Sequence, residues 1–236
     1  MTHGKQFFLL ILLTINVLAC KNEPADTSPE AQAETKADPN LMSPEALQHV
    51  RDSLAKDPTT TTQIAAPATA KPISTIGKEQ ILLKDATQIP LPKEGDKSST
   101  VLFFATPAAK SPESTALSTD GLIQSTRLTR MLANVGLTVV WVEGNTGMQT
   151  GLGAAKENHA EFNLIDPKTA GETMKTIVGN YMGKKILVVA SPPVLSDMLT
   201  QLAGKKVVEV PSSYAPVLYY AKVRAIGDAD IMELSY

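Results

Sequence analysis

Ser191 is the residue whose position could support nucleophilic chemistry. It follows the apolar run Lys185–Ala190, so its hydroxyl would stand at the end of a buried strand. Pro192 and Pro193 come next, and no glycine flanks the serine as in a nucleophile elbow. His159, the only histidine after residue 98, shows no sequence sign of lying near Ser191. A serine hydroxyl without a base is a poor nucleophile, so these residues argue against an active Ser191.

Several glycines after a predicted strand could cradle a phosphate through backbone N–H groups: Gly144, Gly147, Gly151 and Gly153. A Walker A loop would end in Gly-Lys-Ser/Thr, and a dinucleotide fingerprint would need a glycine where Lys156 stands. Neither pattern is present. We therefore expect a flexible loop over Gly144–Gly153 and a short helix over Ala154–Asn158.

Metal-binding and cofactor-binding patterns are missing from the stretch Ser99–Tyr236. It has one His and no Cys, and its Asp and Glu residues are scattered singly, so no ligand spacing is met. The sequence therefore predicts neither a metal nor a cofactor. Arg127 and Arg130 lie one turn apart on a predicted helix and are expected on its solvated face.

The framework for these residues is best defined by the stretch Thr100–Leu132. Its apolar run Val101–Ala105 predicts a strand, a Pro/Ser/Thr-rich loop follows, and the later apolar spacing predicts an amphipathic helix. Together they form the first half of a βαβ unit. Its loop stands at the carboxyl end of the strand, where open α/β sheets place their sites. That loop contains no His, Arg or Cys.

The rest of the chain alternates predicted strands and helices. Further strands are expected at Leu137–Glu143, Phe162–Ile165, Lys185–Ala190, Val207–Val210, Val217–Val223 and Ala229–Leu234, and helices at Thr169–Tyr181 and Val194–Leu202. Fully apolar strands that alternate with amphipathic helices predict an α/β domain, residues 99–236, whose mostly parallel sheet carries helices on both faces.

The N-terminal residues 1–20 have the three parts of an export signal. Lys5 supplies the positive charge, Phe7–Val17 is almost entirely apolar, and Leu18-Ala19 supplies small residues for cleavage. The apolar core is shorter than the roughly 20 residues of a membrane-spanning helix. An ordinary secretory signal followed by a chance cysteine would also fit these features.

Leu18-Ala19-Cys20 resembles the lipobox of bacterial lipoproteins, and Cys20 is the only cysteine of the chain. The resemblance implies a diacylglycerol on the Cys20 thiol and a lipid anchor in a bacterial cell envelope. Lys21 at the next position favours the outer membrane by the same resemblance.

Residues 21–75 have the composition of a tether. Pro, Ala, Glu, Thr and Asp dominate, and such a chain buries too little apolar surface to fold. Ser43-Pro44 predicts the start of a short helix at 44–55. Residues 76–98 are expected to add an edge strand. The net charge of −2 predicts no binding to nucleic acid.

Several motifs in the predicted domain resemble the histidine phosphatase superfamily, the phosphoglycerate-mutase-like fold. The family's helix-start motif is kept as Leu117, Ser118, Gly121, Gln124 and Ser125, and Gln149 and Thr150 are kept after the next strand. The family's four phosphoryl-binding positions are replaced: Thr106 and Pro107 stand for Arg-His, Thr146 for the second Arg and Ser191 for the second His.

The resemblance implies the fold and argues against the activity. In that family the first His is phosphorylated, and the second His and the Args hold the phosphoryl group. Pro107 has no nucleophilic atom, and phosphoryl transfer depends mainly on such cationic stabilisation. We therefore expect an inactive domain with a binding or scaffold role toward an envelope protein or a small ligand. The pocket would be lined by Lys110, Asn145, Gln149 and Ser191. A hydrolase that uses Ser191, Lys110 or Asn145 is the alternative.

Lipidation of Cys20 can be tested by changing Cys20→Ala and fractionating bacterial cells that express the chain. We expect the wild type with the membranes and the variant in the soluble fraction, because the anchor would be lost. Equal membrane partitioning of the two proteins would contradict the lipoprotein interpretation.

Overall fold

The computed structural model describes residues 67–93, 95–205, 210–211 and 216–236. The expected signal peptide, Cys20 and the short helix at 44–55 lie outside the described residues. The same holds for residues 207–209 of the expected strand Val207–Val210. All structural statements that follow refer to the described part of the chain.

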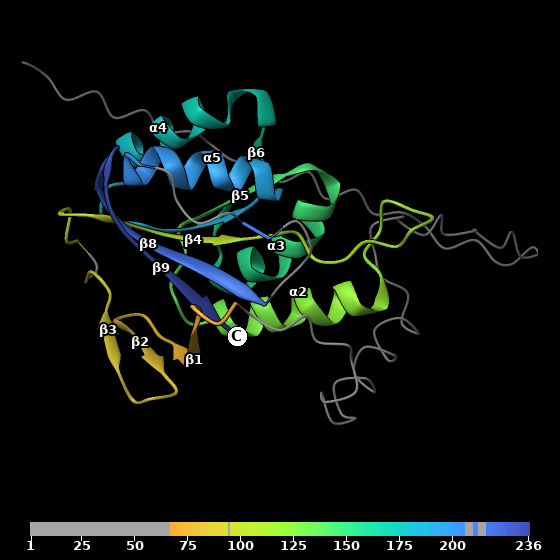
Figure 1. Ribbon diagram of the computed structural model, residues 1–236, viewed down its shortest axis with the longest axis horizontal. Helices are drawn as coiled ribbons and strands as arrows, with labels where there is room; N and C mark the ends of the chain where they lie inside the picture. Colours follow the sequence, from red (N-terminus) through yellow and green to blue (C-terminus); the bar gives the residue numbers. More distant parts are fainter. Residues whose placement is uncertain (1–66, 94, 206–209, 212–215) are drawn as a thin grey trace, which may run out of the picture. The chain divides into compact units, whose positions relative to one another are not determined.

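Nine strands form one mixed sheet with the order β3-β2-β1-β9-β8-β4-β7-β5-β6 (Figure 1). The neighbours β4, β7, β5 and β6 run parallel to one another. β8 is antiparallel to both β4 and β9, and β1 is parallel to β9. The strands span β1 Lys71–Ile76, β2 Gln80–Leu83, β3 Gln88–Pro90, β4 Thr100–Ala105, β5 Val139–Glu143, β6 Glu161–Ile165, β7 Lys185–Val189, β8 Val217–Ala225 and β9 Asp228–Ser235.

The expectation of a mostly parallel sheet is wrong, because β8 and β9 form a hairpin. Their turn contains Gly227 with a φ of 81°, which reverses the chain within two residues. β8 lies in the interior of the sheet and is buried over Val217–Ala221 on both faces. A continuous apolar run of this kind is typical of parallel strands, so the sequence concealed the direction of β8.

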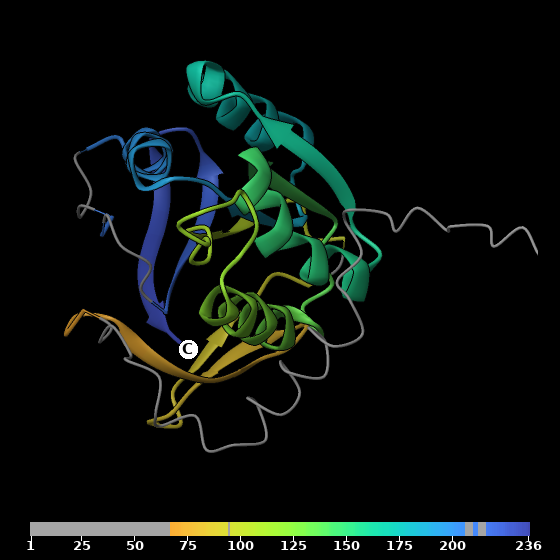
Figure 2. The same cartoon turned by 90° about the vertical axis from the view of Figure 1, so that its right-hand side faces the viewer.

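The expected helices are confirmed on both faces of the sheet. In Figures 1 and 2, α4 and α5 lie on one side and α2 and α3 on the other. Alternate residues of β4 enter opposite cores, Leu102 and Phe104 toward α4 and α5, and Val101 and Phe103 toward α2 and α3. The helices span α2 Thr119–Leu132, α3 Gly144–Asn158, α4 Ala170–Asn180 and α5 Pro192–Ala203, with a 3-10 helix, η2 Pro167–Thr169, before α4. In the described segments, no helix has the length and apolar content needed to cross a bilayer.

The expected flexible loop over Gly144–Gly153 is instead the first part of α3. Gly147 and Gly151 lie one turn apart on its buried face. A Cβ on Gly151 would lie 3.0 Å from a methyl carbon of Val142, and one on Gly147 would lie 3.1 Å from the carbonyl oxygen of Val189. The glycines therefore let α3 pack directly on the sheet, which offsets their low helix propensity of about 1 kcal/mol each.

The described fold begins earlier than the expected domain boundary at residue 99. β1 starts at Lys71, inside the expected tether of residues 21–75, and β2 and β3 lie in the segment 76–98. β3 is an edge of the sheet, as predicted for this segment. β1, β2 and β3 form an antiparallel meander, and its apolar residues are buried against β9 and α2 in a shared core: Ile73, Ile76, Ile81, Leu83 and Leu91.

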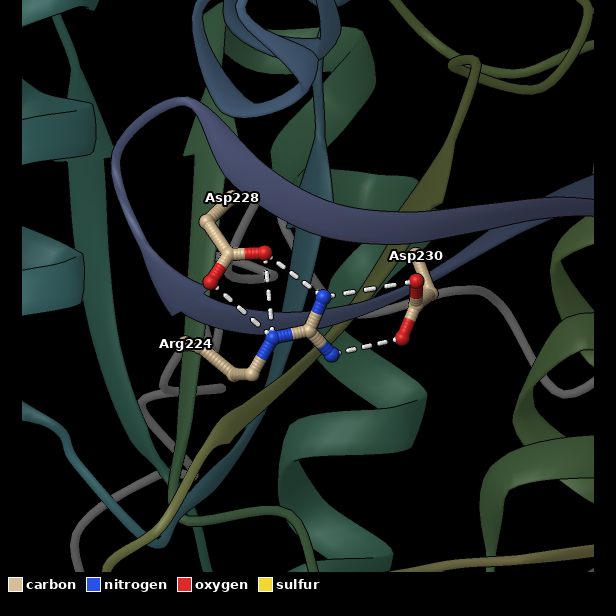
Figure 3. A network of polar contacts seen from close by, with 3 residues as sticks. All are labelled: Arg224, Asp228 and Asp230. Atoms are coloured by element: carbon tan, nitrogen blue, oxygen red, sulfur yellow. Dashed lines mark hydrogen bonds and ion pairs between the residues drawn. The ribbon is translucent and has the colours of Figure 1, made fainter.

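An exposed charge cluster closes the tip of the β8–β9 hairpin. Figure 3 shows the Arg224 guanidinium between the carboxylates of Asp228 and Asp230, at distances of 2.6 and 2.7 Å. The hydrogen bonds to Arg224 hold the pKa of both carboxyl groups below the usual value. Because all three side chains are exposed, the cluster orders the turn more than it stabilises the fold.

Replacing a buried residue of the meander tests whether β1–β3 unfold together with the rest of the domain. Ile81 is fully buried, so Ile81→Ala should lower the free energy of unfolding by about 2–5 kcal/mol in urea titrations followed by the fluorescence of Trp141. The exposed neighbour supplies a control, Gln80→Ala, which should have little effect. Equal stability of the two variants would show that the meander is not part of the cooperative unit.

Candidate functional site

An open hollow of about 330 Å³ lies at the carboxyl ends of β4, β5 and β7. These strands are parallel, so the residues that follow them meet at one edge of the sheet. The lining comes from the loop after β4, the junction of β5 with α3, and the junction of β7 with α5: Pro107, Ala108, Lys110, Glu143, Gly144, Asn145, Thr146, Ser191 and Pro192.

The Glu143 carboxylate joins two of these junctions. Its Oε2 accepts a hydrogen bond of 2.6 Å from the Ser191 backbone N–H and one of 2.7 Å from the Ser191 hydroxyl. Glu143 is the last residue of β5 and the N-cap of α3, while Ser191 is the N-cap of α5. One half-buried carboxylate therefore stands at the amino ends of two helices, where the helix dipoles favour negative charge.

The hollow carries one positive and one negative side chain, Lys110 and Glu143. No ion pair joins them in the described part of the chain, where the paired carboxylates belong to Asp228 and Asp230. Asn145, Thr146 and Ser191 add an amide and two hydroxyls. Its walls are otherwise the apolar Pro107, Ala108 and Pro192 and the backbone of Gly144.

The structure places the sequence candidates in three different surroundings. Pro107, Lys110, Asn145, Thr146 and Ser191 line the hollow. Thr106 is 7% exposed and stands behind the lining, in the buried start of the loop. Gln149 does not line the hollow either, because its side chain is taken up by the loop.

Gln124 and Gln149 fasten the loop between β4 and α2 from two helices. Gln124 Oε1 accepts a hydrogen bond of 2.8 Å from the Ala109 N–H. Gln149 Oε1 accepts one of 3.0 Å from the Leu117 N–H, and its Nε2 donates one of 3.0 Å to the Thr115 carbonyl. These amides therefore satisfy backbone groups of a segment that has little regular structure of its own.

Thr150, Ser118 and Gly121 hold the ends of the same loop. The buried Thr150 Oγ1 accepts from the Ala108 N–H at 2.9 Å. Ser118 caps α2 by accepting from the Gly121 N–H at 3.0 Å. A Cβ on Gly121 would lie 1.9 Å from the carbonyl oxygen of Ala109, so the close approach of the loop to α2 requires glycine.

Glu143 is the site residue that the sequence reasoning missed. Its signal was a charged residue at the end of the apolar strand LTVVWVE, at the edge of the sheet where sites gather. His159, by contrast, caps the other end of α3, about 24 Å along the helix from Glu143 at 1.5 Å per residue. It cannot serve as a base for Ser191.

The remaining candidates for ligand binding are metal-ligating clusters and methionines of the described segments. No group of three or more His, Cys, Asp or Glu residues among them could hold a metal ion. Met174 and Met198 are fully buried in the core against α4 and α5, where they pack.

Several solved structures are similar to this chain, including the following three. SixA, a protein histidine phosphatase solved with tungstate, shares 12% identity over 57% of this chain and 96% of its own, with a TM-score of 0.46. An Escherichia coli protein described as an alpha-ribazole-5'-phosphate phosphatase shares 12% identity over 58% of this chain and 97% of its own, with a TM-score of 0.45. A phosphoglycerate mutase of Plasmodium falciparum shares 13% identity over 59% of this chain and 91% of its own, with a TM-score of 0.39.

Each of these three matches covers 57–59% of this chain, with a TM-score below 0.5. The identities are too low to carry an activity from those proteins to this one. No family model and no curated protein matches the sequence.

The loop fastening can be tested with Thr150→Val, which keeps the side-chain volume and removes the hydroxyl. The buried Ala108 N–H would lose its acceptor, so we expect the free energy of unfolding to fall by about 1–3 kcal/mol. Thr176→Val is the matched control, because Thr176 makes the same bond to the carbonyl four residues earlier but is exposed and touches no loop. If both variants lose the same stability in urea titrations, the loop bond contributes nothing.

Proposed function

We propose that this chain is a membrane-anchored lipoprotein whose histidine-phosphatase-like domain is catalytically inactive and acts by binding. The observation that carries the proposal is the position of the Glu143 carboxylate. It lies at the amino end of α5 and accepts hydrogen bonds from the Ser191 N–H and hydroxyl. A phosphoryl group at the end of β7 would meet a negative charge of the protein's own.

Electrostatics at the hollow support this proposal. Phosphoryl transfer is catalysed largely by positive groups that stabilise the charge of the transferring group. Lys110 is the only cation of the lining, and Glu143 opposes it. Two like charges about 4 Å apart repel by about 4 kcal/mol at an effective dielectric constant of 20, which is enough to cancel one favourable contact.

The residue types at the family's catalytic positions support it as well. Pro107 lines the hollow without a nucleophilic atom, and Thr146 and Ser191 line it without a positive charge. Thr106 is buried behind them. These side chains retain the shape of a site and lack its chemistry.

The proposed anchor is the acylated Cys20 in a bacterial cell envelope, with the outer membrane favoured by Lys21. Residues 21–66 would connect it to the described domain. Its support is the signal-like segment and the single cysteine at the lipobox position. In this arrangement the domain presents its hollow to a ligand or an envelope protein near the membrane.

A hydrolase with a remodelled site is the second candidate, favoured by the hydrogen bond of 2.7 Å from the Ser191 hydroxyl to Glu143. A carboxylate at this distance could accept the serine proton. The backbone argues against it. In a nucleophile elbow the next residue supplies an N–H to the oxyanion, whereas Pro192 has none, and the Ser191 N–H is already donated to Glu143.

Hydrolysis of a small aryl phosphate at acid and neutral pH tests the inactive domain. We expect no turnover by the wild type and none by Pro107→His, because a nucleophile alone has no cationic cradle. The smallest change expected to give turnover combines Thr106→Arg, Pro107→His, Thr146→Arg and Ser191→His, since groups that act as a unit have non-additive effects. Wild-type turnover that is lost in Ser191→Ala would contradict the proposal and favour the remodelled hydrolase.

A further inference from the structure

We infer that the hollow binds a small zwitterion, a molecule of the amino-acid type that carries one amine and one carboxylate. The ligand amine would bind the Glu143 carboxylate, and its carboxylate would bind the Lys110 ammonium. This inference rests on the proposed binding role and adds the chemical class of the ligand.

The first support is that two opposite charges face one hollow without neutralising each other. Lys110 and Glu143 both belong to the lining, and no ion pair between them is present among the described residues. Their charged atoms are therefore more than an ion-pair distance apart, at the lining of the same hollow. A ligand that carries an amine and a carboxylate can form one ion pair with Glu143 and another with Lys110 at the same time.

The second support is the way Glu143 is held. Only its Oε2 takes part in the hydrogen bonds with Ser191. Oε1 has no hydrogen bond in the described part of the chain, and it is not among the buried atoms that lack a partner. It therefore remains accessible as an acceptor. Because two hydrogen bonds already fix the carboxylate, a ligand amine would lose little affinity to side-chain ordering.

The size of the hollow sets the size of the ligand. A volume of about 330 Å³ is that of roughly ten water molecules, at about 30 Å³ each in the liquid. It is large enough for a molecule of about ten non-hydrogen atoms. Pro107, Ala108 and Pro192 would contact an apolar side chain, while Asn145 and Thr146 offer further hydrogen bonds.

Other classes of small ligand fit the charges less well. An anion such as phosphate would be attracted by Lys110 and repelled by Glu143. A simple protonated amine would be attracted by Glu143 and repelled by Lys110. A neutral polar molecule would leave both charges unpaired when it displaces their water, which costs free energy. The zwitterion alone gains at both side chains.

Titration calorimetry with the purified full chain tests this inference. The zwitterionic probes are alanine, β-alanine and γ-aminobutyrate, which separate amine and carboxylate by increasing lengths. n-Butylamine, butyrate and inorganic phosphate are the matched probes with one kind of charge. We expect at least one zwitterion to bind at least tenfold more tightly than every singly charged probe, with the preferred length reporting the separation of Lys110 and Glu143.

Charge-neutral variants assign the two contacts. Glu143→Gln keeps an oxygen that can accept from Ser191 and removes the negative charge, and Lys110→Gln removes the positive charge. Each substitution should lower the affinity for the zwitterion at least tenfold. Glu161→Gln and Lys168→Gln are matched controls at exposed positions outside the hollow, and they should leave its affinity unchanged.

The remaining outcomes separate this inference from the proposed function. Zwitterion binding that is insensitive to both variants, or equal affinity for a singly charged probe, would overturn the inference. Binding of phosphate that strengthens in Glu143→Gln would make the hollow an anion site and would also overturn it. The absence of binding by any probe would exclude the zwitterion and leave a scaffold role. Turnover of the aryl phosphate would instead contradict the proposed function itself.

Discussion

The hydrogen bonds from Ser191 to the Glu143 carboxylate connect the two strand ends on which the candidate site depends. β5 leads into α3 and β7 leads into α5, and the two strands are parallel neighbours. Their helices therefore begin at the same edge of the sheet, on opposite faces, and each begins with backbone N–H groups that have no partner within the helix. A protein that holds its own carboxylate there satisfies the Ser191 N–H without a ligand. The same carboxylate gives the hollow one negative side chain beside its one positive side chain, Lys110.

The polar side chains and the glycine around the loop after β4 have a common structural task. Gln124, Gln149 and Thr150 accept hydrogen bonds from backbone N–H groups of the loop after β4, and Gly121 allows that loop to approach α2. None of these interactions requires a bound phosphate. The loop is therefore held by neutral groups, and none of its fastenings depends on a charged residue of the hollow.

Packing at α3 shows how tertiary contacts override local preference. The segment after β5 contains four glycines within ten residues, which by propensity favours a loop. Two of them lie one turn apart and face the sheet, where a larger side chain would collide with Val142 or the backbone of Val189. Helix formation here brings α3 close enough to bury Ala154 and to present Glu143, Asn145 and Thr146 at the hollow.

The sequence by itself determined the parts of the fold that depend on local periodicity. The apolar runs at β4, β5 and β7 and the helical spacing in α2, α4 and α5 require no knowledge of neighbours, and they place Pro107 and Ser191 at one edge of the sheet. Tertiary structure alone decided the direction of β8, the inclusion of β1 and the helix at Gly144. It also placed Glu143 against Ser191. Each of these depends on contacts between residues far apart in the chain, such as Tyr219 beside Phe104 or Glu143 beside Ser191. Burial and hydrogen bonding across such distances leave no periodic signal in the sequence.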